Sequence, residues 1–368
     1  MKITRITVYQ KDLPLAKPYW LSGGRLKFEV LDATFVHVET DAGIDGWGEG
    51  CPWGVTYLPA HGRGIRAGLE EIAPLLIGLD PCQIDRINRA MDLALPGHLY
   101  VKSAVDIACW DILGKVSGRP ICELLGGREP DPVPIASSIS TDTPEGMLDD
   151  VKHYRDLGYR VHSCKVGADV ALDVKRIRHL AANELSGEKI FFDANRAWLP
   201  REAMTVMNAV GPMEAWFEQP CETLDEIRLV RQQVSQSICV DEALHTFDDL
   251  LRIHRDGIAE LVNIKINRVG GLTKARRIRD FCLATGITML VMETGGSVLA
   301  DTATAHLAQS IPAPSCLGTW SCQEMLTVDP APGRGVRNVD GCFTAPSEPG
   351  LGVVPDDGAL GEPIASYQ

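Results

Sequence analysis

The sequence lacks the features of several large protein classes. Its 11 cysteines include no Cys-x-x-Cys pair, and most of them lie inside apolar runs. A cysteine in such a run behaves as a small hydrophobic residue, which argues against a zinc site or a secreted disulfide framework. No apolar stretch approaches the roughly 18 residues of a membrane helix, and no uninterrupted apolar signal region begins the chain. We therefore expect a cytoplasmic protein without a membrane partner.

The chain also lacks an excess of positive charge. The chain has 36 Lys and Arg against 49 Asp and Glu, a net charge of −13, and no basic cluster. This balance argues against a nucleic-acid partner. Walker loops, Gly-x-Ser-x-Gly motifs and glycine-rich dinucleotide motifs after a strand are missing as well. The 368 residues, 45% hydrophobic and 23% charged, suit a globular protein with a large core and two domains.

The first 130 residues have the pattern of an α+β domain. Alternating apolar residues predict strands over 3–10 and 27–39, and apolar residues at helical spacing predict helices over 66–76, 85–95 and 100–116. The last helix is expected to stop at Gly118 and Pro120, before a proline-rich boundary near residue 130.

Two segments of this region, 18–24 and 51–57, combine large aromatic residues with Gly and Pro. Packing in a core is one reading of these aromatics. We also expect the two segments to be loops, and aromatic loops of this kind suit a lid over a small ligand. Tyr57 is the lid residue that we place in substrate binding, with Trp20 or Trp53 beside it.

From residue 131 the pattern changes to short apolar runs that alternate with amphipathic helices. The expected strands are 133–139, 160–166, 189–194, 215–219, 237–242, 261–266, 287–293 and 315–320. The expected helices are 144–157, 171–183, 201–210, 223–233, 246–255, 272–285 and 297–309. The prediction is an α/β fold: a modified (β/α)8 TIM barrel over 131–324, with the last helix position poorly filled. The tail, 325–368, is expected to pack on the first domain and complete an α+β capping domain.

Five ionisable residues end successive strands of this barrel. From Lys165 to Asp193, Glu218, Asp241 and Lys265 the intervals are 28, 25, 23 and 24 residues, about one strand, one helix and two loops. A parallel barrel places the C-terminal ends of all its strands on one face. Three carboxylates and two lysines should therefore meet at one mouth.

The three carboxylates Asp193, Glu218 and Asp241 favour a metal site. Any one of them taken alone is more simply a helix cap or a solvated charge. Three in register would repel each other without a cation, and oxygen ligands without His or Cys favour Mg²⁺, or Mn²⁺ as a substitute, over zinc.

Each lysine lies in an apolar strand, so that a lysine extending along the barrel exterior is the alternative. Beside a divalent cation in the mouth, the pKa of Lys165 and of Lys265 should fall toward neutrality, which makes each a candidate general base. Opposed bases and Mg²⁺ suit removal of the α-proton of a carboxylate substrate. Reprotonation from the other face inverts the centre, and departure of a β-hydroxyl gives dehydration. A barrel that binds without catalysis, or one that uses Lys165 as a Schiff-base nucleophile, would leave the three carboxylates unexplained.

The motifs identify the chain as similar to the enolase superfamily, in the branch of muconate-lactonizing enzymes and mandelate racemases. The residues that carry this resemblance are Gly46-Trp47-Gly48-Glu49, the helical segment 104–115, the five strand ends and the segment 263–271. The resemblance implies a capping domain over a modified barrel, Asp193, Glu218 and Asp241 as metal ligands, and Lys165 and Lys265 as the acid/base pair.

Two departures from the family pattern bear on the substrate. Ser163 stands where the family has the first lysine of a Lys-x-Lys pair, and Gly318-Thr319-Trp320-Ser321 replaces the Asp-x-Asp of dipeptide epimerases. The second departure argues against a dipeptide. Trp320 and Tyr57 could instead enclose a cationic amine by cation–π contact.

This aromatic pair is similar to that of family members acting on proline derivatives. The resemblance implies a cis-3-hydroxy-L-proline dehydratase that gives 1-pyrroline-2-carboxylate, with hydroxyproline 2-epimerase activity beside it. Alternatives are a betaine or amino-acid 2-epimerase without dehydration, and an acid-sugar dehydratase. A homo-oligomer and a small-molecule partner with a carboxylate and a cationic amine are expected. The remaining candidate substrate-binding residues are Glu293, Ser163, Asn195 and Thr294, of which Ser163 and Thr294 could assist the leaving hydroxyl.

Overall fold

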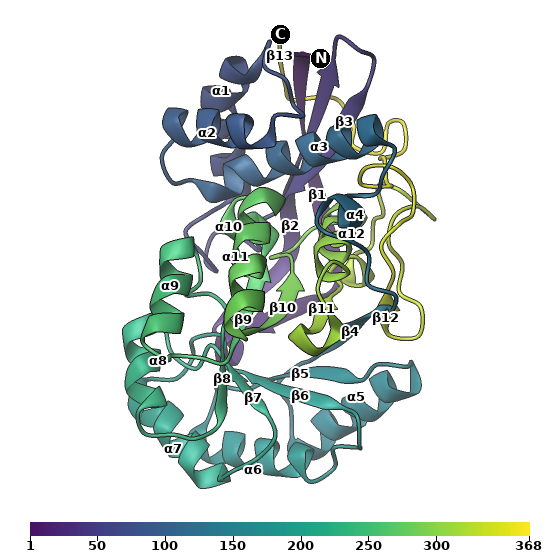
Figure 1. Cartoon of the computed structure of the whole chain (residues 1–368). Helices are drawn as coiled ribbons and strands as arrows, with labels where there is room; N and C mark the ends of the chain where they lie inside the picture. The colour runs from purple at the N-terminus through teal and green to yellow at the C-terminus, as the bar shows by residue number, and fades with distance from the viewer.

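The structure is a computed structural model that describes all 368 residues, and it contains two sheets. The smaller sheet has four antiparallel strands in the order β13-β1-β2-β3. These are β13 (Ala365–Tyr367), β1 (Ile3–Leu21), β2 (Leu26–Thr40) and β3 (Asp45–Gly50). The last residues of the chain thus form an edge strand beside the first ones, and both termini lie at the same end of the molecule (Figure 1).

Four helices follow in this part of the chain: α1 (Gly62–Leu76), α2 (Ile84–Ala94), α3 (Leu99–Ser117) and α4 (Ile121–Leu124). Helices α1 and α3 pack against the sheet, α2 packs on α1 and α3, and α4 packs on α3 and on α12 (Val298–Ala308). Helix α3 lies directly on β3. A Cβ atom at Gly46 would stand 2.2 Å from the Ala108 carbonyl oxygen, and one at Gly48 would stand 2.0 Å from that of Ala104. Glycine at these two positions therefore allows backbone contact between the strand and the helix.

The larger sheet contains eight parallel strands that close into a barrel through pairing of β11 with β4. The strands are β4 (Val133–Ile139), β5 (Val161–Lys165), β6 (Lys189–Asp193), β7 (Trp216–Glu218), β8 (Ser237–Val240), β9 (Leu261–Lys265), β10 (Thr288–Met292) and β11 (Cys316–Trp320). The short strand β12 (Cys342–Phe343) adds to β4 in the antiparallel sense. The predicted barrel fold is confirmed.

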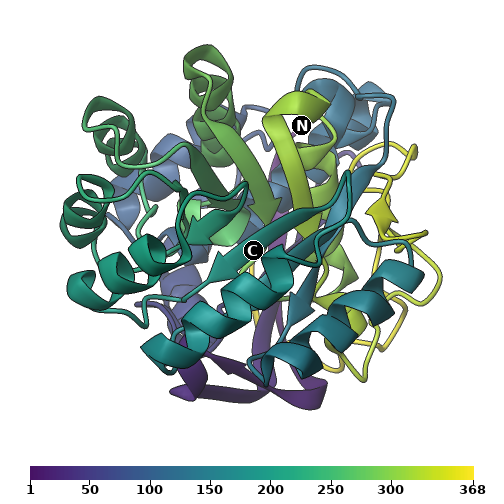
Figure 2. The same cartoon turned by 90° about the horizontal axis from the view of Figure 1, so that it is seen from below.

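The barrel helices surround the strands (Figure 2). They are α5 (Pro144–Asp156), α6 (Val170–Ala181), α7 (Pro200–Val210), α8 (Leu224–Arg231), α9 (Phe247–Arg255), α10 (Ile266–Val269), α11 (Leu272–Thr285) and α12 (Val298–Ala308). Only a 3₁₀ turn, Gln323–Met325, follows the eighth strand. This agrees with the poorly filled last helix position. No helix combines the length and the apolar character that crossing a membrane requires.

The predicted loop over 18–24 is wrong. The chain continues as strand β1 through Leu21 and turns only at Ser22–Gly24. Tyr19 and Leu21 are buried, whereas Trp20 between them is 47% exposed, which is the alternation of a strand with one buried face. The long β1–β2 hairpin extends from the capping sheet to the barrel (Figure 1).

The C-terminal tail runs back along the end of α3. The Leu351 backbone N–H donates to Asp111 of α3 at 2.7 Å, and the backbones of Gly350 and Arg119 are joined by a hydrogen bond of 2.9 Å. The chain divisions at residues 130 and 324 stay a prediction.

Candidate active site

A buried cavity of about 50 Å³ lies where the barrel strands end and the capping hairpin meets them. Of the predicted site residues, those that line it are Lys165, Lys265, Asp193, Glu218, Asp241, Tyr57, Trp320, Glu293, Ser163, Asn195 and Thr294. The barrel register explains the meeting of the strand-end residues, because Lys165 pairs with Asp193 and Asp193 with Glu218 across adjacent strands.

Trp20 is the exception among the predicted residues. Its side chain faces solvent, with the Lys27 ammonium 5.6 Å from its ring. Tyr19 and Trp53 line the cavity instead, and their ring centroids lie 5.3 Å apart. Trp53 also packs edge-on against Trp320 at 5.6 Å. Tyr19, Trp53 and Trp320 therefore form an aromatic wall of the cavity. Trp20 does not belong to this wall, because side chains of adjacent residues in a strand point to opposite faces of the sheet.

The three strand-end carboxylates do not form a closed three-ligand cluster in this structure. Each one accepts from its own neighbour. Asp193 pairs with Lys165, Asp241 pairs with Lys265 at 2.6 Å, and Glu218 accepts from the Asn263 amide at 2.9 Å. Like charges repel, so carboxylates that share a cavity turn toward separate donors.

The donor set nevertheless fits a hard divalent cation. Burial, together with the nearby charges of Asp193 and Asp241, raises the pKa of Glu218 well above its ordinary value. A cation among the three groups would relieve that unfavourable charge. Carboxylate oxygens without His or Cys are the ligands expected for Mg²⁺ or Mn²⁺.

The pKa of Lys165 is raised here, and the fall predicted beside a divalent cation stays a prediction. Burial by itself lowers this pKa, but the charges of Asp193 and Glu218 outweigh it, so that the pKa lies above its ordinary value. The prediction assumed a lysine that faces a divalent cation, whereas here Lys165 faces a carboxylate. Its side chain is 11% exposed, so it lies inside the barrel mouth and not on the barrel exterior.

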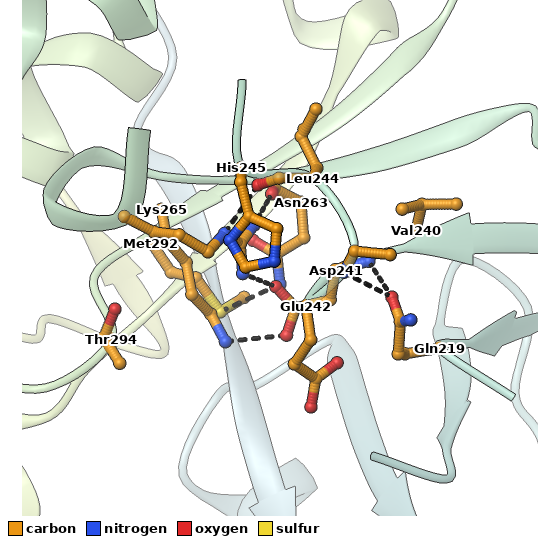
Figure 3. A network of polar contacts seen from close by, with 12 residues as sticks. Gln219, Val240, Asp241, Glu242, Leu244, His245, Asn263, Lys265, Met292 and Thr294 are labelled. Atoms are coloured by element: carbon orange, nitrogen blue, oxygen red, sulfur yellow. Dashed lines mark hydrogen bonds and ion pairs between the residues drawn. The ribbon is translucent and has the colours of Figure 1, made fainter. Parts of the chain in front are cut away.

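Lys265 lies in a denser network (Figure 3). Its Nζ is 2.6 Å from Oδ2 of Asp241 and 3.0 Å from the Tyr57 hydroxyl. The Gln219 side-chain oxygen accepts from the backbone N–H of Asp241 at 2.8 Å. The carboxylate of Glu242 points away from Lys265 and Asp241, as Figure 3 shows.

Arg268 and Asn263 are the residues that sequence reasoning missed here. Both lie in the segment 263–271 that carried the family resemblance, on either side of Lys265, but neither was given a role. The arginine is fully buried and donates to Asp241 at 2.5 Å, and the Asn263 amide donates to Glu218. The signal available in the sequence was Arg268 itself, because a charged residue is rarely found within a buried segment unless it has a partner.

The capping domain closes the cavity from above through two contacts with the loop after β6. The Ser22 hydroxyl donates to the Asn195 carbonyl oxygen at 2.7 Å, and Arg196 donates to the Tyr57 carbonyl oxygen at 2.6 Å. The Arg196 guanidinium also lies 5.4 Å from the Tyr57 ring. The two aromatic segments therefore meet on one barrel loop and cover the site.

Family models match both parts of the chain. A mandelate racemase / muconate lactonizing enzyme N-terminal domain matches residues 3–126, and an enolase C-terminal domain-like model matches residues 146–359. The chain belongs to the enolase superfamily. Within it, the mandelate racemase / muconate lactonizing enzyme family is the branch whose N-terminal domain is matched.

Known proteins resemble this chain over most or all of its length. A cis-3-hydroxy-L-proline dehydratase of Roseibium aggregatum is 41% identical and covers 100% of both chains. An N-succinyl-L-Arg/Lys racemase of Bacillus cereus is 31% identical, over 84% of this chain and 85% of its own. A superfamily member from Roseovarius nubinhibens, solved in complex with magnesium, is 54% identical with a TM-score of 0.96, and the match covers 100% of this chain and 99% of that one.

Proposed function

We propose that this protein is a Mg²⁺-dependent cis-3-hydroxy-L-proline dehydratase that gives 1-pyrroline-2-carboxylate, with hydroxyproline 2-epimerase activity beside it. The observation that carries this proposal is one buried cavity in which two lysines stand on opposite sides of three carboxylates. Support for the substrate comes from the relative of that name, which is 41% identical over its whole length.

The arrangement of the lysines follows from the strand order. Lys165 ends β5 and Lys265 ends β9, four strands apart in a closed ring of eight, so the two lysines face each other. One lysine can take a proton from the α-carbon of a substrate between them, and the other can return one to the opposite face. Inversion and dehydration both begin with removal of the α-proton.

Asp193, Glu218 and Asp241 would hold the metal ion. When bound, Mg²⁺ supplies positive charge that stabilises the negative charge arising on a substrate carboxylate as the α-proton leaves. Mn²⁺ has similar ligand preferences and is the expected substitute.

The aromatic wall suits the other end of the substrate. Trp320, Trp53 and Tyr19 line the same cavity as the lysines. Aromatic faces attract a cationic amine, and their bulk keeps water away from the reacting carbon.

The decisive experiment is incubation with cis-3-hydroxy-L-proline in D₂O. We expect deuterium at C2 of recovered substrate, and pyrroline-2-carboxylate as product. Absence of both from every proline derivative tested would refute the proposal. The epimerase without dehydration, which the racemase among the relatives favours, predicts C2 exchange with no pyrroline. A cytoplasmic location and a homo-oligomeric state stay predictions.

A further inference from the structure

Glu293 is a buried carboxyl group of the cavity with one free oxygen. It directly follows β10, and only 1% of its surface is exposed. Its Oε2 accepts from the backbone N–H of Asn267 at 3.0 Å and from the Asn267 side-chain amide at 2.8 Å. Its Oε1 is buried and has no hydrogen-bond partner in the protein.

No cation contacts Glu293, in contrast to Asp193 and Asp241 of the same cavity, each of which pairs with a lysine. Burial raises the pKa of Glu293 to about 8, and the two bonds from Asn267 only partly oppose this rise. At neutral pH the group therefore carries a proton. Because Oε2 accepts two N–H bonds, the proton is on Oε1.

A buried O–H group without an acceptor costs free energy, so a ligand oxygen that accepts from Oε1 would stabilise it. Glu293 lines the cavity, and its Oε1 is thus a neutral proton donor without a protein partner. A leaving hydroxyl needs such a donor, because hydroxide is a poor leaving group and water is a good one.

We propose that Glu293 is the catalytic acid that protonates the departing C3 hydroxyl of the substrate. This inference rests on the proposed dehydratase function. A lysine takes the proton from C2, and the electron pair of that C–H bond forms the C2=C3 double bond. The C3–O bond breaks with its electron pair going to oxygen. The proton on Oε1 moves to that oxygen, so that water leaves and Glu293 remains as a carboxylate, which solvent reprotonates before the next turnover. The enamine that is formed tautomerises to 1-pyrroline-2-carboxylate, because its nitrogen loses a proton and C3 takes up a proton from solvent.

The position of Glu293 also assigns the base. Met292, the residue before it, pairs in register with Lys265 on the neighbouring strand, so that Glu293 stands on the Lys265 side of the mouth. In cis-3-hydroxyproline the ring carboxylate and the hydroxyl share a face, and the C2 proton lies on the other. Lys165, across the barrel, therefore faces the C2 proton, while Glu293 faces the hydroxyl.

The other candidate donors are weaker acids or are already engaged. Thr294 lies 3.3 Å from the Tyr100 hydroxyl, and an alkyl hydroxyl such as that of Thr294 or Ser163 does not release a proton near neutral pH. The ammonium of Lys265 is bound to Asp241 and to Tyr57.

The test is Glu293→Gln, in which an amide N–H can replace the O–H donor but cannot give up a proton. We expect pyrroline formation to fall by roughly 10²- to 10⁴-fold, the range for a lost general acid. Deuterium exchange at C2 should stay within about threefold of wild type, because that step does not use Glu293.

Asp106→Asn is the matched control, since Asp106 is also fully buried but its oxygens accept from Asn88 and Thr273 and it does not line the cavity. This variant should change the rate of C2 deuterium exchange and the rate of dehydration by the same factor, even if it lowers the stability of the protein.

Two results would overturn the inference while leaving the proposed function intact. If E293Q forms pyrroline as fast as wild type, another group on the same side of the substrate, such as Lys265, is the acid. If E293Q loses exchange and dehydration equally, Glu293 acts in binding or in proton abstraction. Wild-type protein that exchanges C2 deuterium without forming pyrroline would overturn the dehydratase function, and with it the role of Glu293.

Discussion

Arg268 and Lys265 hold the two oxygens of Asp241 from opposite ends. Nη1 of Arg268 lies 2.5 Å from Oδ1, and Nζ of Lys265 lies 2.6 Å from Oδ2. The remaining guanidinium nitrogens donate to the carbonyl oxygens of Leu244 and Asn263. Burial raises the pKa of Asp241, but the two cations outweigh it and the pKa is lowered, so the carboxylate stays ionised.

We therefore expect Arg268→Met to weaken Mg²⁺ binding about 10- to 100-fold, the usual effect of losing a group that orients a ligand. Titration calorimetry with MgCl₂ would measure this. Arg279→Met is the matched control, because Arg279 is buried as well but bonds to Leu125 and Ser310 outside the cavity. Equal Mg²⁺ affinity in R268M and R279M would contradict the role of Arg268.

Removal of divalent cations should abolish activity. With EDTA we expect C2 exchange to fall below about 1% of its initial rate, because an amine base is too weak to remove the α-proton without cationic stabilisation. Mg²⁺ or Mn²⁺ in excess should restore it. Exchange that persists in EDTA would mean that Asp193, Glu218 and Asp241 serve another purpose.

Trp320 is expected to bind the ring nitrogen of the substrate. A cation–π contact contributes about 0.5–2 kcal/mol, so Trp320→Leu should raise KM by about 2- to 30-fold with a smaller change in kcat. Steady-state kinetics with cis-3-hydroxy-L-proline would check this. An unchanged KM would place the nitrogen elsewhere in the cavity.

Gly23 lies at the tip of the hairpin that covers the site, in the left-handed region at a φ of 61°. A Cβ there would stand 2.3 Å from the Gly167 carbonyl oxygen on the barrel. We expect Gly23→Ala to displace the tip and lower kcat/KM by about tenfold or more. Gly24→Ala is the control, because its φ of 84° brings similar backbone strain but no atom lies within 4 Å of its Cβ. Equal losses in both variants would show that strain, not contact, matters.

The buried acid Glu293 predicts a pH dependence of stability. Its pKa rises from 4.5 to about 8 on folding, mainly through burial. Between these values the folded chain holds a proton that the unfolded chain releases, so this group stabilises the fold at pH 4.5 and loses that contribution as the pH rises to about 8.

Urea unfolding at pH 5 and pH 8 would measure this effect. We expect the free energy of unfolding to fall less over that range in Glu293→Gln than in wild type, since Gln does not titrate. The same slope in both proteins would mean that Glu293 ionises normally.

The barrel and its five strand-end residues could be predicted because each βα unit is local. A strand, a helix and two loops occupy about 25 residues, and the alternation of apolar and polar residues is visible within each unit. The lid was predicted less well. Taking 18–24 as a loop concealed its strand alternation, and Trp20 was chosen where Tyr19 lines the cavity. Along a strand, an error of one position exchanges the inside for the outside.

The sequence by itself determined the parallel barrel, the carboxylate and lysine sets, and the aromatic character of the wall, since these follow from residue type and spacing. Only the tertiary structure decided how each charge is paired. Lys165 faces Asp193, Arg268 holds Asp241, and Asn267 occupies one oxygen of Glu293 while leaving the other free. Such pairings depend on distances of a few ångströms between strands, and they set protonation because charge and burial act over that range.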